Sequence, residues 1–221
     1  MMWRDSPGDL YDLIFIGYWL LRGLGWCWIM DNVPPELTAI LREIEKALEA
    51  KLYYLAIAVA LSVPDICACL ECDPDKPIWA TQDKYVGWCA TNLDSYFKNL
   101  AGVDLFRIRG GVLHQGHFDH PKARFDRVLF IGPESRIKAH DIVVTVEPGV
   151  SFGGISAEEL RLSGKILQLD VVRFCQSIMD AARSWAISKA KDPYVQKNLP
   201  NLVRYRPEGL PPFSVGIPTV A

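Results

Sequence analysis

Several features that would assign a function directly are missing from this chain of 221 residues. It has no G-x-S-x-G of serine hydrolases, no dinucleotide-binding glycine pattern, no H-E-x-x-H, and no P-loop lysine after its glycine pair at 153–154. Positive charge is not in excess either, because 24 Lys and Arg stand against 26 Asp and Glu, a net charge of -2. This balance excludes a protein that coats nucleic acid through its overall charge. Any contact with nucleic acid must come from a local basic patch.

The first thirty residues are apolar, yet they lack an uninterrupted run of membrane-spanning length. Their longest clean run extends from Leu13 to Leu21, whereas a transmembrane helix needs about twenty apolar residues. A signal peptide is not expected, because acidic residues outnumber basic ones before this run. We expect residues 1–29 to be an appendage or an upstream extension before a natural start at Met30, with a membrane anchor as the alternative. We expect a cytoplasmic protein without stable membrane insertion.

Metal-binding cysteine patterns are also scarce. The six cysteines include one C-x-x-C, Cys69 to Cys72, and no second pair follows at zinc-finger spacing. Free cysteine in an apolar helical run behaves as a small buried hydrophobe. Without a secretory signal, we expect all six thiols to be reduced.

What the chain does contain is helical periodicity. Apolar residues recur at steps of three and four over 35–63, and again over 169–191, where Asp170 is the expected N-cap. Pro64 should break or kink the first of these helices. Weaker patterns predict helices over 79–97 and from 103 to a stop at Gly116. The last thirty residues, 192–221, hold six prolines and should form an extended, non-helical tail.

The period changes between the third and fourth helix. Segments 127–132 and 141–147 are rich in β-branched residues and are separated by a polar stretch. They predict a β-hairpin inserted at about 125–150, before the last long helix. The predicted fold is therefore mainly α, a helical domain over residues 30–191 with one β insertion.

The chemistry concentrates in "RIRGGVLHQGHFDH", residues 107–120, which holds two arginines and three of the four histidines. Arg107 and His114 are seven residues apart, two helical turns, and so share one face; Arg109 and His114 differ by about 140°. If Gly110 and Gly111 loosen the turn, either arginine could serve. A histidine can move a proton near neutral pH, and an arginine can hold a phosphate and steady its developing charge. Together these groups suffice for cleaving RNA without a metal.

The segment "RGGVLH" resembles the R-x(4–6)-H motif of the HEPN superfamily, all-helical domains that include many toxin, abortive-infection and CRISPR-associated ribonucleases. The wider chain resembles a group of uncharacterised bacterial proteins, a likeness that brings no activity with it. The HEPN resemblance implies a helical bundle and a metal-independent endoribonuclease in a toxin or phage-defence setting. It also implies Arg109 and His114 as the catalytic pair, with Arg107, Gln115 and His117 as supporting contacts to RNA. The partners it implies are RNA, a second protomer and a cognate antitoxin, and no cofactor is expected. Gly110 departs from the polar residue usual at its position.

Two alternatives remain open at this point. His114, His117 and His120, with Asp119, have the spacing H-x2-H-x2-H that a loop could wrap round zinc, although we expect no metal there. The chain could also be a non-catalytic helical interaction protein in which the motif is incidental. Whether Arg109 and His114 converge on an open cleft would discriminate between a nuclease and such a protein.

Overall fold

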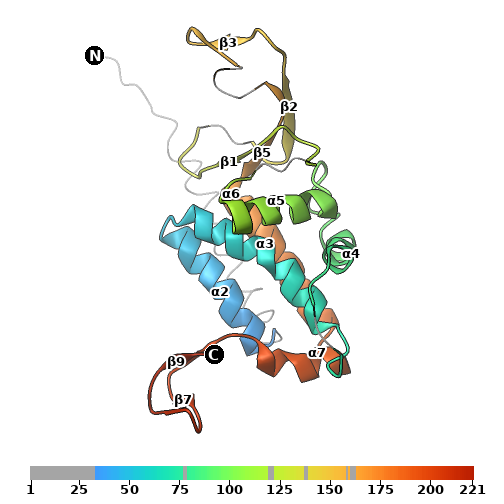
Figure 1. Cartoon of the computed structure of the whole chain (residues 1–221), viewed down its shortest axis with the longest axis vertical. Coiled ribbons are helices and arrows are strands. Elements are labelled where there is room, and N and C mark those ends of the chain that lie inside the picture. Colours follow the sequence, from blue (N-terminus) through green and yellow to red (C-terminus); the bar gives the residue numbers. More distant parts are fainter. Residues whose placement is uncertain (1–32, 77–78, 119–121, 137–138, 158, 160–162) are drawn as a thin grey trace, which may run out of the picture. The chain divides into compact units, whose positions relative to one another are not determined.

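The structure, a computed structural model, describes residues 33–221 except 77–78, 119–121, 137–138, 158 and 160–162. The chain divides into two units after Val33, and the fold given below is that of Pro34–Ala221. It is a mixed α/β structure in which helices dominate (Figure 1). Residues 1–29 lie outside the described residues, and so does the expectation made for them.

The helix predicted over 35–63 is two helices, α2 (Pro35–Glu49) and α3 (Tyr53–Leu70). The chain reverses between them at Lys51, whose φ of 58° lies in the left-handed region. Pro64 does not break the helix, which was one of the two predicted outcomes, but lies buried inside α3. Proline removes one helix hydrogen bond, and the burial of ten of the eighteen residues of α3 offsets that loss.

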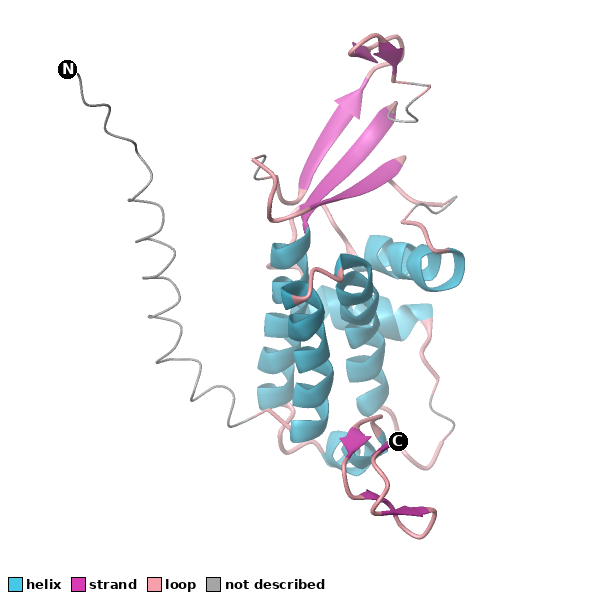
Figure 2. Cartoon of the chain, turned by 90° about the vertical axis from the view of Figure 1, so that its left-hand side faces the viewer, coloured by secondary structure: helices cyan, strands magenta, loops and turns pink. Residues whose placement is uncertain are grey.

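Helix α3 lies at the centre of the helical layer and packs against both α2 and α6 (Val171–Ser188); Figure 2 shows long helices side by side. Within the described residues, α3 alone has the length and apolar character to cross a membrane. More than half of it is buried against its neighbours, as in the core helix of a folded domain. Its ten buried positions are Ala56, Ile57, Ala58, Ala60, Leu61, Val63, Pro64, Asp65, Cys67 and Leu70.

The other predicted helices are confirmed with altered ends. Helix α4 spans Gln82–Asn92 and is shorter at both ends than the predicted range 79–97. Thr81 is its N-cap, and the Thr81 hydroxyl accepts a hydrogen bond from the Lys84 amide. Helix α5 spans Gly102–Gln115 and ends, as predicted, at Gly116. Asp170 caps α6 as predicted, since its carboxylate accepts from the Arg173 amide at 2.9 Å.

The predicted hairpin of 127–132 with 141–147 is wrong. Strands β1 (Arg127–Ile131) and β2 (Ile142–Val146) exist, but each pairs with β5 (Gly164–Asp170), which lies between them. Strand β1 is parallel to β5, and β2 is antiparallel to it. The third strand was missed because Gly164–Asp170 carries Lys and Gln among its apolar residues and runs directly into α6, so its pattern merged with that helix. A short ladder of β3 (Ser151–Phe152) with β4 (Ile155–Ser156) separates β2 from β5 along the chain.

The C-terminal tail is not uniformly extended, so the non-helical prediction is wrong at its start. Pro193–Asn198 forms α7, capped by the Asp192 carboxylate, and a 3-10 turn follows at Leu199–Asn201. Pro193 stands at the first helical position, where its missing amide has no partner to lose. The last residues form two small antiparallel ladders, β6 (Tyr205–Arg206) with β9 (Thr219–Val220) and β7 (Gly209–Leu210) with β8 (Ser214–Val215).

Candidate functional site on helix α5

Helix α5 carries the predicted site, and its two ends are fixed by specific contacts. At the start, the Ala101 amide donates to Asp104 Oδ2 at 3.1 Å, and Arg124 Nη2 pairs with the same oxygen at 2.8 Å. At the end, Gly116 has a φ of 72°, and its amide donates to the Gly111 carbonyl. The Tyr54 hydroxyl of α3 donates to the Val112 carbonyl at 2.9 Å. The last turn of α5 is therefore braced by α3.

Arg109 does not present a free guanidinium. Its Nη2 lies 2.6 Å from Asp65 Oδ2 of α3, in an ion pair whose side chains are 22% and 10% exposed. The guanidinium also lies 5.9 Å from the centre of the Phe106 ring. Arg109 thus connects α5 to the core helix of the domain.

The electrostatics of this pair are unbalanced. Burial raises the pKa of Asp65 above its ordinary value, and the nearby Arg109 charge opposes the rise only in part. Asp65 Oδ1 and Arg109 Nε have no hydrogen-bond partner among the described residues. Each such buried polar atom carries a desolvation cost, so the pair is held by the packing of α3 against α5 as much as by its own contact.

His114 lies in the last turn of α5 and is exposed, as are Gln115 and His117. Arg107 is half-buried. The helix is regular from Gly102 to Gln115, so the two-turn spacing places Arg107 and His114 on one face, about 10 Å apart along the axis. In the described part of the chain, neither residue has an ion pair.

The two residues of the R-x4-H motif, Arg109 and His114, therefore have different surroundings in the structure. In a regular α5, Arg109 and His114 point about 140° apart, and Arg109 is engaged with a buried carboxylate. Arg107 is the arginine that shares the face of His114. The catalytic pairing of Arg109 with His114 stays a prediction.

The zinc alternative gains no support from the residues that can be placed. No group of three or more His, Cys, Asp or Glu suited to a metal occurs among the described residues. His120 and Asp119, two members of the proposed set, lie outside the described residues.

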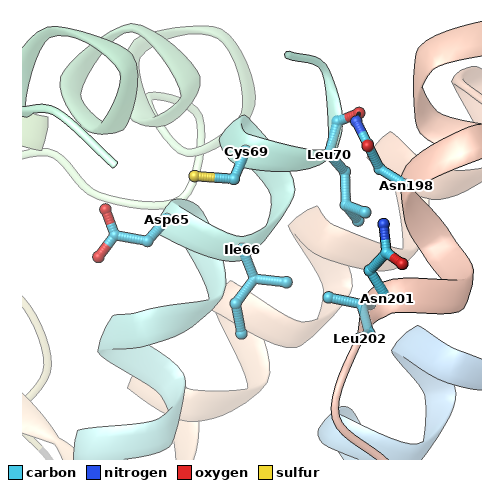
Figure 3. Close-up of a pocket in the computed structure, with 7 residues that line it drawn as sticks. All are labelled: Asp65, Ile66, Cys69, Leu70, Asn198, Asn201 and Leu202. Atoms are coloured by element: carbon cyan, nitrogen blue, oxygen red, sulfur yellow. Dashed lines mark hydrogen bonds between the residues drawn. The ribbon is translucent and has the colours of Figure 1, made fainter. Parts of the chain in front are cut away.

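A small, mainly apolar pocket lies beside the C-terminal half of α3, with a volume of about 260 Å³. Its lining comes from α3, from the end of α7 and from the segment after α7: Asp65, Ile66, Cys69, Leu70, Asn198, Asn201 and Leu202. Figure 3 shows the Asp65 carboxylate and the Cys69 thiol turned away from the side chains of Asn201 and Leu202. The pocket and the α5 site thus share Asp65, which lines the pocket and pairs with Arg109.

Three side chains near the site or the sheet were given no part in the candidate site from the sequence. Asp65 could have been noticed as the one carboxylate within the apolar half of α3, because a buried carboxylate requires a partner. Tyr54 carries no such signal. His140, the histidine outside the cluster, lies 5.9 Å from the Phe97 ring, and its pKa is lowered by burial and by the nearby Arg173 charge.

Fold and site together define a helix-dominated α/β protein with a polar and basic helix face. Comparisons of this chain with protein-family models, curated proteins and solved structures find no match.

Proposed function

We propose that this protein is a metal-independent endoribonuclease of the HEPN type, acting as a homodimer in a toxin or phage-defence setting. The observation that carries the proposal is the face shared by Arg107 and His114 on α5. An exposed imidazole lies on this face with a cation that has no ion pair among the described residues, two turns apart on a helix whose ends are fixed.

The chemistry asked of this face is general acid–base catalysis with charge stabilisation. His114 removes the proton of a ribose 2′-hydroxyl, whose oxygen forms a bond to the adjacent phosphorus. The bond from phosphorus to the 5′ oxygen breaks, and this oxygen takes the proton from the His114 imidazolium, which returns the imidazole to its neutral form. Arg107 steadies the charge that develops on the phosphoryl oxygens. The products would be a 2′,3′-cyclic phosphate and a 5′-hydroxyl.

In this proposal the two arginines have different tasks. Arg109 has its charge neutralised by Asp65 and holds α5 against α3, which fixes the direction in which His114 projects. Arg107 remains available for a phosphate. Gln115 and His117, both exposed beside His114, extend the polar surface along which RNA would lie.

A second candidate function is a non-catalytic helical interaction protein. The ion pair of Arg109 with Asp65 favours it, because the arginine of the R-x4-H motif then has a structural role. Under this alternative, His114 is an ordinary solvated histidine at the end of a helix.

The two candidates separate in a cleavage assay on single-stranded RNA in the presence of EDTA. The full chain is compared with the variants Arg107→Ala and His114→Ala. Arg42→Ala, which removes an exposed arginine from α2, is the matched control. We expect loss of a general acid–base group to lower the rate roughly 100-fold or more, with Arg107→Ala also reduced and Arg42→Ala unchanged. Equal rates for all four proteins, or no cleavage by any of them, would leave the interaction protein as the better account.

A further inference from the structure

Gly110 leaves a gap in the surface of α5. It lies within the helix, where glycine is less stable than alanine. Among the described residues, a Cβ built on Gly110 would meet no side chain and no backbone of another element within 4 Å. Alanine would therefore fit at this position and would make the helix more stable. Packing within the chain gives no reason for a glycine here.

An open glycine in a helix is not by itself a site, because Gly87 of α4 is open in the same way. The neighbours of Gly110 on the helix surface are what distinguish it. At 100° per residue, Phe106 and Leu113 lie about 40° and 60° to one side of it. His114 and Arg107 lie about 40° and 60° to the other side.

These five residues form one surface, which we call the Gly110 surface. Its first edge is apolar, with Leu113 40% exposed and Phe106 half-buried. Its second edge carries the guanidinium of Arg107 and the exposed imidazole of His114. Gly110 lies between the two edges and adds only backbone.

The position of Gly110 also decides how a ligand reaches His114. The Cα–Cβ bond of a helical residue tilts toward the N-terminus, so His114 projects over the turn that holds Gly110. Residues four apart on a helix have Cβ atoms about 5–6 Å from each other. Any side chain at position 110 would therefore stand beside the imidazole, and glycine leaves its approach open.

The charge of this surface suits an anion. Arg107, unlike Arg109, makes no ion pair with a described residue. Helix α5 has one acidic residue, Asp104, which is 3% exposed and pairs with Arg124. No exposed carboxylate of α5 therefore competes with a phosphate for Arg107.

We propose that Gly110 seats one nucleotide of a single-stranded RNA, with the ribose against its bare backbone. The phosphate is held by Arg107, the 2′-hydroxyl faces His114, and the base rests on the edge formed by Phe106 and Leu113. Glycine permits this close approach of ligand and backbone, and an unpaired base offers a flat face to such an edge. The inference rests on the proposed function and restricts its substrate to unpaired RNA.

The first test sets stability against activity. Gly110→Ala and the matched control Gly87→Ala should each raise the urea midpoint of unfolding by about 0.5 M, because alanine is the better helix former. Gly110→Ala should nevertheless lower kcat/KM for single-stranded RNA in EDTA roughly 100-fold, since a displacement of about 1 Å at a reacting centre costs this much. Gly87→Ala should leave kcat/KM unchanged. A purely structural role of Gly110 cannot produce a more stable and less active variant.

The second test measures binding without cleavage. A single-stranded oligonucleotide of 2′-deoxyribose lacks the attacking hydroxyl, and its affinity is measured by fluorescence anisotropy. Gly110→Ala and Gly110→Asn should each raise its dissociation constant roughly tenfold or more, the equivalent of one lost contact, and Gly87→Ala should not.

The outcomes separate this inference from the proposed function. If the wild type cleaves RNA and Gly110→Ala cleaves equally well, or Gly110→Asn cleaves faster, the seat at Gly110 is overturned and the nuclease remains. Binding that Gly110→Ala weakens, without cleavage by the wild type, supports the seat and contradicts the nuclease. A wild type that neither binds nor cleaves overturns both.

Discussion

The ion pair between Arg109 and Asp65 gives the sharpest test of how α5 is held. Replacing Arg109 by Leu leaves the Asp65 carboxylate, 10% exposed, without its counter-charge. Breaking a buried pair in this way costs about 3–5 kcal/mol. Since the Arg109 side chain is 22% exposed and makes a single contact with Asp65, we expect the lower end, about 3 kcal/mol. With a urea m-value of about 2 kcal/mol/M, this moves the midpoint of unfolding down by about 1.5 M.

The pH dependence of that loss follows from the carboxyl group. Burial raises the pKa of Asp65 above its ordinary value of 3.8, so the native state binds this proton more tightly than the unfolded chain does. The contribution of Asp65 to stability therefore falls as pH rises from 3.8 toward the folded pKa. Arg109→Leu removes the charge that opposes the shift. The deficit of the variant should be largest at neutral pH and should shrink as pH approaches 3.8.

Urea unfolding followed by circular dichroism, at several pH values, measures both effects. The double variant Arg109→Leu with Asp65→Leu should recover most of the lost free energy, because replacing both members of a buried pair by apolar residues is often near neutral. Arg107→Leu is the matched control on the same helix and should change stability by less than about 0.5 kcal/mol. If Arg109→Leu costs less than about 1 kcal/mol and shows no pH dependence, the structural role assigned to Arg109 is refuted.

Three further predictions concern other contacts. Tyr54→Phe removes the hydroxyl that donates a hydrogen bond to the Val112 carbonyl, and it should lower the free energy of unfolding by about 1 kcal/mol. Amide hydrogen exchange in the last turn of α5 should become faster, and an unchanged exchange rate would contradict the bracing of α5 by α3. Asp170→Ala deletes the N-cap of α6 and should lower the free energy of unfolding by about 1 kcal/mol in thermal melts, whereas Asp170→Asn should lose much less. Burial raises the pKa of Cys175 to about 12, so at pH 8 this thiol should react with maleimide only after unfolding, and rapid labelling of native protein would be inconsistent with its burial.

The helices could be predicted because their signals are local. Spacing of three and four residues identified α2, α3 and α6, and two short-range rules located the N-cap at Asp170 and the C-cap at Gly116. The break at Lys51 and the continuation through Pro64 could not be predicted in this way. Both are decided by how α3 packs between its neighbours, which outweighs local propensity.

The sheet and the state of the site depend on contacts that are distant in sequence. Strand β1 pairs with β5 across more than thirty residues, and no turn signal encodes such a parallel pairing. The pairing of Arg109 with Asp65 is equally remote. The spacing of seven residues from Arg107 to His114 predicts that they share one face of α5, and α5 is helical over both positions. The ion pair of Arg109 with Asp65 could be found only from the three-dimensional structure.

The most direct test of the proposed function is the chemical nature of the cleaved ends. Purified full-length protein is incubated with a labelled single-stranded RNA in EDTA, and the products are analysed by mass spectrometry. The account predicts 2′,3′-cyclic phosphate and 5′-hydroxyl ends from the wild type and no such products from His114→Ala, with the variant folded as judged by circular dichroism. Cleavage that needs an added metal, or that His114→Ala leaves unchanged, would contradict it.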